Sequence, residues 1–353
     1  MPINQVLGED LKQTVHSAIP WESLKSGRFL ITGATGLVGS MLVKTLLYGN
    51  KEKNLDINVY AVVRSREKAN DIYKDFLPDP ALRFINVDLT IDDLAVDEPI
   101  DFIIHSAAVT KSKTMVEKPV ETIQTVVLGT IKTLELAREK RVKSYVYLSS
   151  MEMYGTFADS SKMTTEDDLG YINPLAVRSN YPESKRMCEN ICISYLSEYQ
   201  VPVKIARLAQ TFGAGILPDE NRIFAQFARS VLSQKDIVLH TKGLSEGNYC
   251  YLSETVEGIL LLLIKGENGE AYNIVNENCH TTIAQMAEMI ANEIACGKIK
   301  VVFDIPQKNI YGYASDTHMK LSSEKMKKLG WQPKIDLKES YLRLIKYLEM
   351  EER

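Results

Sequence analysis

The sequence has few of the features that would tie it to an oxidising compartment or to a membrane. Cysteine occurs only five times, and no two cysteines show the C-x-x-C spacing of a metal or redox motif. We therefore expect free thiols, no metal site and a cytoplasmic protein. The first residues lack a basic region followed by an apolar one, so we expect no signal peptide. The apolar run Gly258–Ile264 is far shorter than the roughly 20 residues that cross a bilayer, and we expect it to form a buried helix.

An excess of positive charge is also missing. The chain has 42 Lys and Arg against 46 Asp and Glu, a formal net charge of -4. This balance gives no reason to expect a nucleic acid or an anionic membrane as a partner. Any anionic ligand must then be held by local charges and by backbone dipoles.

What the sequence does contain is a regular alternation of short apolar runs and longer helix-period segments. Short β-rich runs that alternate with helices are typical of βαβ units, whose parallel sheet is covered by helices on both faces. The pattern predicts an α/β fold with a doubly wound parallel sheet of the Rossmann type. The expected strands are Phe29–Ile31, Val59–Val63, Phe84–Val87, Phe102–Ile104 and Tyr145–Leu148, with Val203–Arg207 as a later member.

A glycine-rich segment follows the first expected strand and opens a helix. Its three glycines allow a tight turn, a close approach of the backbone to a pyrophosphate, and close packing of the helix on the strand. The N-terminus of the helix adds free N–H groups and a partial positive charge. The segment predicts a dinucleotide site with Gly33, Thr35, Gly36, Leu37, Val38 and Gly39 at the cofactor.

The end of the second expected strand bears on the choice between NAD and NADP. A carboxylate there would bind the ribose 2′-hydroxyl and repel a 2′-phosphate. The segment Val63–Arg66 offers Arg64 and Arg66 and no acidic residue. These cations suit NADP if they reach the ligand; the alternative is that they are solvated loop charges.

A tyrosine and a lysine lie four residues apart, at Tyr181 and Lys185, on an expected helix over 181–199. This spacing puts both side chains on one face of the helix. An ordinary tyrosine has a pKa of about 10, and a neighbouring ammonium together with a positive nicotinamide ring would favour its phenolate. Tyr181 can then act as a base and later as an acid, and we expect Lys185 to bind the nicotinamide ribose. A strand that ends in Ser149 and Ser150 could supply a hydroxyl to orient the substrate.

The G-x-x-G-x-x-G spacing and the Y-x-x-x-K motif together resemble the extended class of short-chain dehydrogenases. The resemblance implies NAD as the cofactor and identifies Ser150, rather than Ser149, as the catalytic serine. It also adds cofactor contacts from the expected strand ends, at Asp88, Leu89, Ala107 and Ala108.

Within that class the chain is most similar to UDP-glucuronate decarboxylases. The similar segments are Asn173–Pro174, 178–189, 206–213, 221–227 and Leu329–Pro333. The resemblance implies a nucleotide-sugar substrate and a homodimer formed through the helix that carries Tyr181. The substrate contacts that we expect are Tyr154, Arg178, Gln210 and Arg222.

Several positions depart from the decarboxylase pattern. Gln210 replaces an asparagine, and Val126 replaces another near the cofactor. Gly247 and a position near His318 align with the arginines that grip the diphosphate in relatives. Arg222, Arg178 and Lys242 could compensate for the missing cations, or the nucleotide differs.

The sequence also places an acid, Glu152, two residues after Ser150. A glutamate stands there in UDP-glucuronate decarboxylases and in dTDP-glucose 4,6-dehydratases, but the dehydratases place an aspartate before it, where this chain has Met151. We expect a decarboxylase-like enzyme that transiently oxidises the sugar 4-hydroxyl, with Tyr181 as base and Glu152 as a further catalytic residue. The alternatives are a nucleotide-sugar 4-epimerase, a 4,6-dehydratase, or an NAD(P)-binding module without turnover.

The same patterns suggest a division of the chain into three parts. Residues 1–26 form a lead-in helix with apolar residues at helical spacing, and residues 27–210 form the NAD-binding domain. Residues 211–353 form a smaller α/β domain that mainly binds substrate. We expect the chain to cross between the two domains.

Overall fold

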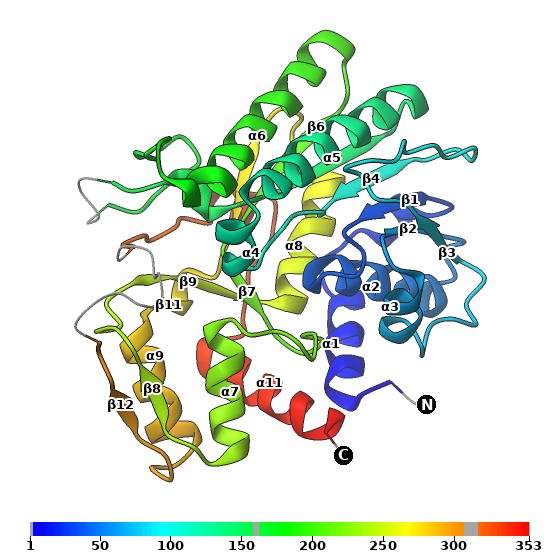
Figure 1. Ribbon diagram of the computed structural model, residues 1–353. Helices are drawn as coiled ribbons and strands as arrows, with labels where there is room; N and C mark the ends of the chain where they lie inside the picture. Colours follow the sequence, from blue (N-terminus) through cyan, green and yellow to red (C-terminus); the bar gives the residue numbers. More distant parts are fainter. Residues whose placement is uncertain (1–2, 158–161, 307–316, 353) are drawn as a thin grey trace.

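The main feature of the computed structural model, which describes residues 3–157, 162–306 and 317–352, is a seven-stranded sheet. Its strand order is β10-β6-β5-β4-β1-β2-β3, and every neighbouring pair is parallel (Figure 1). The predicted doubly wound α/β fold is therefore confirmed. The strands are β1 Arg28–Thr32, β2 Asn58–Val63, β3 Leu82–Asn86, β4 Phe102–His105, β5 Ser144–Ser150, β6 Val203–Leu208 and β10 Ala271–Ile274.

Helices cover both faces of this sheet because both faces are apolar. Side chains alternate between the faces of a strand, and along β1 Phe29 and Ile31 join one buried cluster while Leu30 joins the other. The first cluster includes residues of α1 (Gln5–Val15), α2 (Leu37–Lys53) and α8 (Leu252–Lys265). The second lies under α5 (Pro119–Lys140) and α6 (Asn180–Tyr199), which pack side by side. Two short helices, α3 (Arg66–Ile72) and α4 (Ser112–Glu117), follow β2 and β4.

The remaining elements form two smaller sheets and their helices. Strands β7 (Gln210–Phe212), β9 (Glu246–Tyr251) and β11 (His280–Thr282) make one sheet, and β8 (Ile237–Leu239) pairs with β12 (Val301–Phe303) in the other. They lie with α7 (Ile223–Ser233), α9 (Ile283–Met289) and α11 (Leu337–Glu351) beyond one edge of the large sheet (Figure 1). A last short helix, α10, spans Glu324–Lys328. The domain limits drawn from the sequence stay a prediction, but α8 and β10 show where the chain returns to the first sheet.

The apolar run Gly258–Ile264 lies inside α8, as expected, and most residues of this helix are buried. Helix α9 ends at Met289 and is continued by a π-helical turn, Ile290–Ile294. Within the described ranges, no helix combines the length and the apolar character needed to span a membrane.

A buried carboxylate joins the first helix to the end of the chain. Asp10 of α1 is fully buried; its Oδ1 accepts from Arg343 Nη1 of α11 at 2.7 Å and its Oδ2 from the Tyr251 hydroxyl at 2.7 Å. Burial raises the pKa of Asp10 to about 6, although both partners lower it. Tyr251 ends β9, so this group ties the two ends of the chain to the smaller sheet.

We expect Arg343→Met to lower the free energy of unfolding by about 2 kcal/mol at neutral pH, because it leaves a buried carboxylate without its cation. The folded pKa of Asp10, about 6, lies above its ordinary value of 3.8, so the folded protein holds the proton more tightly and the contribution of Asp10 to stability falls as the pH rises between these values. The deficit of the variant should therefore shrink near pH 4. Urea unfolding at both pH values measures this. Arg343→Met with Asp10→Asn should recover most of the loss, and an equal deficit at both pH values would contradict the assignment.

Candidate active site

A cavity of about 720 Å³ opens at the carboxyl ends of the parallel strands. Residues that directly follow or end β1, β2, β4, β5 and β6 line it, among them Gly33, Arg64, Ala107, Ser150 and Leu208. In open α/β sheets, ligands bind at this edge where the strand order reverses. Here the order reverses between β1 and β4, so the cavity occupies the position that the fold favours for a dinucleotide.

The glycine loop forms one wall of the cavity, and its backbone leaves no room for side chains. Gly33 has φ +61°, and a Cβ there would lie 2.8 Å from the backbone of Ser106 and Ala107. A Cβ on Gly39 would lie 2.3 Å from the Gly33 carbonyl oxygen. The N-cap of α2 is Gly36, which makes no side-chain cap, so the first N–H groups of the helix stay available to an anion. All six residues predicted from this loop line the cavity, which fits a dinucleotide pyrophosphate.

A buried tyrosine that the sequence did not reveal supports this loop. The Tyr73 hydroxyl, just after α3, donates to the carbonyl oxygen of Ala34 at 2.5 Å. Both residues are completely buried. Tyr73 therefore fixes the middle of the glycine loop from behind.

The adenosine end of the predicted site contains Arg64, Asp88 and Leu89, and all three line the cavity. Arg66 does not line it; its guanidinium lies over the ring of Phe84, 4.6 Å from the centroid. Of the two arginines that suggested NADP, only Arg64 is placed to meet a ligand. Ala107 and Ala108, the other contacts that the resemblance implied, also line the cavity, and Ala107 lies against Gly33 of the glycine loop.

The structure brings Ser150, Tyr181 and Lys185 together in the wall of the cavity. Ser150 ends β5, its hydroxyl oxygen accepts from the Glu152 N–H at 3.2 Å, and it lies close enough to Tyr181, in the first part of α6, to lower the pKa of the phenol. Lys185, one turn later, is buried, and its Nζ donates to the Leu148 carbonyl at 2.7 Å. Its Nζ also lies 5.7 Å from the centre of the Tyr181 ring. The three groups therefore have the positions needed for proton transfer with a bound hydroxyl.

Burial dominates the electrostatics of this set. It raises the pKa of Tyr181 well above the ordinary value; the charge of Glu152 raises it further, and the Ser150 hydrogen bond and the cations Arg178 and Arg222 lower it. Burial also lowers the pKa of Lys185 to about 8. The expected lowering of the Tyr181 pKa is thus not achieved by the protein alone.

Glu152, Gln210 and Arg222, which were predicted to act on or bind the substrate, also line the cavity. Arg222 is bound to Glu220, with Nη2 2.6 Å from Oε2. Lys111, which no sequence pattern indicated, also lines the cavity, and its Nζ lies 2.6 Å from Asp219 Oδ2. Arg222 and Lys111 therefore already have carboxylate partners.

Two predicted substrate contacts lie behind the cavity wall. Tyr154 is fully buried; its hydroxyl donates to Asn273 Oδ1 at 2.8 Å and accepts from Arg207 Nη1 at 3.0 Å. Arg178 binds Glu152 Oε2 through Nη2 at 2.9 Å and does not itself line the cavity. In this structure both residues act on the site through neighbouring side chains.

Two of the positions that depart from the decarboxylase pattern lie close together. Gly247 lines the cavity beside Glu246, whose Oε1 lies 3.3 Å from Nδ1 of His318; His318 itself does not line the cavity. Val126 lies elsewhere, on α5, where it is buried in the core. At Gly247 the cavity wall thus presents a neighbouring carboxylate, where the relatives have an arginine.

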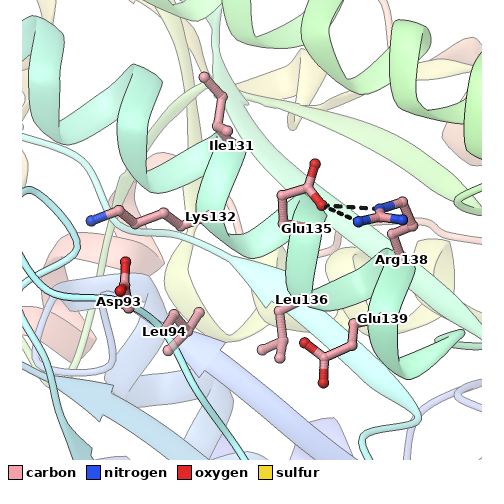
Figure 2. Close-up of a pocket in the computed structure, with 8 residues that line it drawn as sticks. All are labelled: Asp93, Leu94, Ile131, Lys132, Glu135, Leu136, Arg138 and Glu139. Atoms are coloured by element: carbon pink, nitrogen blue, oxygen red, sulfur yellow. Dashed lines mark hydrogen bonds and ion pairs between the residues drawn. The ribbon is translucent and has the colours of Figure 1, made fainter.

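A second hollow of about 360 Å³ lies on the outer side of α5 and carries none of the predicted chemistry (Figure 2). Its charged residues include Glu135 and Arg138, which pair with each other at 2.8 Å. The Tyr195 hydroxyl donates to the other oxygen of Glu135. The hollow is bordered by mutually paired surface charges and is separate from the candidate active site.

The parallel sheet, the glycine loop and the Ser150, Tyr181 and Lys185 set define the class of short-chain dehydrogenases. A model of the NAD dependent epimerase/dehydratase family matches residues 29–275, and the chain belongs to this family.

The relatives of this chain include enzymes with different activities. The chain is 31% identical over 315 residues to "UDP-glucuronic acid decarboxylase 6" of Arabidopsis thaliana, a match that covers 88% of this chain and 86% of the relative. It is 27% identical over 350 residues to dTDP-D-glucose 4,6-dehydratase of Homo sapiens, which covers 94% of each. A solved UDP-glucose 4-epimerase of Thermotoga maritima has the same fold, with a TM-score of 0.76 and 22% identity over 92% of this chain and 100% of that one.

We expect Gly39→Ala to raise the Kd for NAD by at least about tenfold, because the new Cβ would collide with the Gly33 carbonyl and displace the loop. Calorimetric titration of the nucleotide-free protein with NAD measures this. Gly8→Ala is a matched control, since Gly8 lies in α1 and a Cβ there meets only Ile3, at 3.9 Å. If both variants bound NAD with the Kd of the unmodified protein, the glycine loop would not be the binding site of the cofactor.

Proposed function

We propose that the protein is an NAD-dependent enzyme acting on nucleotide sugars, and that it resembles UDP-glucuronate decarboxylases in its reaction. The observation that carries this proposal is the position of Glu152, which lines the cavity beside Ser150 and Tyr181. Relatives named UDP-glucuronic acid decarboxylase, of which the chain covers most of the length, support it.

The residues around the cavity suit NAD as the resident cofactor. The glycine loop and the N-terminus of α2 would hold the pyrophosphate, and Asp88 and Leu89 would lie at the adenine. Solved neighbours of this fold hold NAD, although at 21% to 23% identity they bear on the fold alone. When bound, NAD supplies an acceptor and donor of hydride at the sugar C4. NADP stays the alternative, and Arg64 is the residue that would have to bind its extra phosphate.

The side chains of the site then perform the proton transfers. Tyr181 takes the proton of the sugar 4-hydroxyl, and Ser150 orients that hydroxyl by a hydrogen bond. Lys185 keeps an ammonium near the phenolate ring and would bind the nicotinamide ribose. In the last step Tyr181 returns the proton as the 4-ketone is reduced again. The net reaction therefore consumes no reducing equivalent.

The transient 4-ketone is what makes carbon dioxide leave. In a uronic acid the ketone stands β to the carboxylate, so the C5–C6 bond can break, its electron pair can enter the enolate, and C5 is then protonated. A carboxylate on Glu152 near the substrate carboxylate would repel it in the ground state, and this repulsion disappears as neutral CO2 departs. Glu152 would thus favour the transition state over the bound substrate.

A second candidate is 4-epimerisation of a neutral nucleotide sugar. Glu246 and Gly247 give the substrate wall an acid and no cation, and Arg222 and Lys111 are already paired. A substrate without its own carboxylate would meet less repulsion there. Dehydration has less support, because Met151 occupies the position of the required acid. A module without turnover is disfavoured by the assembled Ser150, Tyr181 and Lys185.

We further propose a cytoplasmic homodimer formed through α5 and α6. Exposed apolar side chains on these two helices support the proposal: Val120, Ile123, Met187 and Ile193. Light scattering of the purified protein would give the mass of the assembly.

Tyr181→Phe should lower turnover by at least about 100-fold, because it removes the proton acceptor. Tyr145→Phe is the matched control, since it also removes a buried tyrosine hydroxyl, one that bonds Thr133 at 2.9 Å outside the cavity. We expect Tyr145→Phe to keep its activity. Equal turnover of both variants would show that Tyr181 is not the base, whereas absence of turnover in the unmodified protein would favour the binding module.

The substrate is tested by a panel of UDP-, CDP- and dTDP-sugars, with products followed by mass spectrometry. We expect UDP-glucuronate to lose the mass of one CO2 without net consumption of NAD. Turnover of a neutral sugar nucleotide, with UDP-glucuronate left unchanged, would reject the decarboxylase and select the epimerase.

A further inference from the structure

An ion pair connects the two short segments that lead into the catalytic groups. Glu152 lies in the 3-10 turn Met151–Tyr154, just after Ser150, and Arg178 lies in the turn Val177–Ser179, just before α6. Arg178 Nη2 and Glu152 Oε2 are 2.9 Å apart, and the side chains are 30% and 36% exposed. Arg178 does not line the cavity, whereas Glu152 does. The arginine therefore holds a cavity residue from outside the cavity.

The charges around Tyr181 come from several elements. Glu152 opposes ionisation of the tyrosine, while Arg178 and Arg222, at the N-terminus of α7, favour it. Ser150 favours ionisation through its hydrogen bond. Lys185 lies on the same helix, and its Nζ is committed to the Leu148 carbonyl. Tyr147 is a neutral neighbour on β5.

The two arginines in this set differ in their partners. Arg222 is neutralised by Glu220, an acid outside this group. Arg178 is paired with Glu152, the acid whose charge acts against Tyr181. Removing Arg178 would therefore take away a favourable charge and also leave an unfavourable one unpaired.

We propose that Arg178 is a positioning residue: its ion pair holds Glu152 at the cavity wall and offsets the negative charge that Glu152 places beside Tyr181. The inference rests on the proposed function only in taking Tyr181 as the base. It holds for any nucleotide sugar whose hydroxyl Tyr181 deprotonates.

The proposal predicts that loss of Arg178 and loss of Glu152 shift the pH at which Tyr181 acts as a base in opposite directions. Without Arg178, the unpaired Glu152 carboxylate disfavours the phenolate, and the base needs a higher pH to act. Without Glu152, the unpaired Arg178 favours the phenolate, and the base acts at a lower pH. When both charges are removed together, the two effects cancel.

The test measures the first proton transfer alone, so that a role of Glu152 in later steps does not enter. The NAD-loaded enzyme is mixed with a nucleotide sugar in a single turnover, and reduced nicotinamide is followed by absorbance as a function of pH. We expect R178Q to move the midpoint of the acidic limb up by about one pH unit and E152Q to move it down. The double variant E152Q/R178Q should return close to the unmodified enzyme. R178K, which keeps the charge, should move the midpoint less than R178Q.

A matched control separates this effect from a general change of charge. R138Q breaks another arginine–glutamate pair of similar length, Arg138 with Glu135, on the outer side of α5 (Figure 2). It should leave the midpoint unchanged. The variants at 178 should also keep the thermal unfolding midpoint, because the pair is partly exposed.

The outcomes distinguish this proposal from the proposed function. If the unmodified protein reduces nicotinamide with a nucleotide sugar but R178Q leaves the midpoint in place, the role of Arg178 is wrong. The same conclusion follows if the double variant E152Q/R178Q keeps the midpoint of either single variant instead of returning close to that of the unmodified enzyme. If no nucleotide sugar of the panel reduces nicotinamide, Tyr181 is not acting as a base on this class, and both proposals fall.

Discussion

The proposed chemistry depends on a tyrosine that must lose a proton inside the protein. Tyr181 is buried, and burial alone makes its phenolate costly. Lys185, the expected source of compensation, is itself buried and bound to a backbone carbonyl, and its own pKa is lowered. The protein without ligand therefore keeps Tyr181 neutral. A positive charge brought next to the ring would favour the phenolate, so the proposed mechanism requires the base to form in the presence of the cofactor.

A buried network of polar side chains beneath α6 fixes the position of Tyr181. Glu189 follows Lys185 by one turn and is buried with Arg207 of β6, with Oε2 and Nη2 2.7 Å apart. The Ser149 hydroxyl donates to the other oxygen of Glu189 at 2.5 Å. Arg207 also reaches the Tyr154 hydroxyl, so one buried network joins α6 to the strand that carries Ser150. Breaking a buried ion pair is strongly destabilising. Movements that would separate Glu189 from Arg207 are therefore unfavourable, and the network holds Tyr181 and Ser150 in place relative to each other.

The sequence predicted the parts of the molecule that local patterns encode. Strand alternation gave the six early strands, the glycine spacing gave the loop at 33–39, and the four-residue spacing gave Tyr181 and Lys185 on one face of a helix. It did not reveal the bond from Tyr73 to Ala34 or the pair of Lys111 with Asp219, because these residues lie far apart in the chain and no periodicity links them. Tyr154 illustrates the opposite case. Its position next to a motif suggested a substrate contact, but the short turn after Ser150 directs its side chain into the core.

The substrate wall shows why the nucleotide is harder to infer than the chemistry. Two cations that line the cavity, Lys111 and Arg222, are paired with Asp219 and Glu220, which lie on one short segment. A diphosphate would have to take the place of these carboxylates. For Lys111 and Asp219, which are both largely exposed, this exchange costs little, since such pairs contribute roughly 0–1 kcal/mol. Arg222 and Glu220 are more buried and joined by two hydrogen bonds, so their separation costs more. Affinity for the nucleotide thus depends on whether the segment 217–222 moves with its acids when substrate binds, and a list of cations in the sequence does not contain that information.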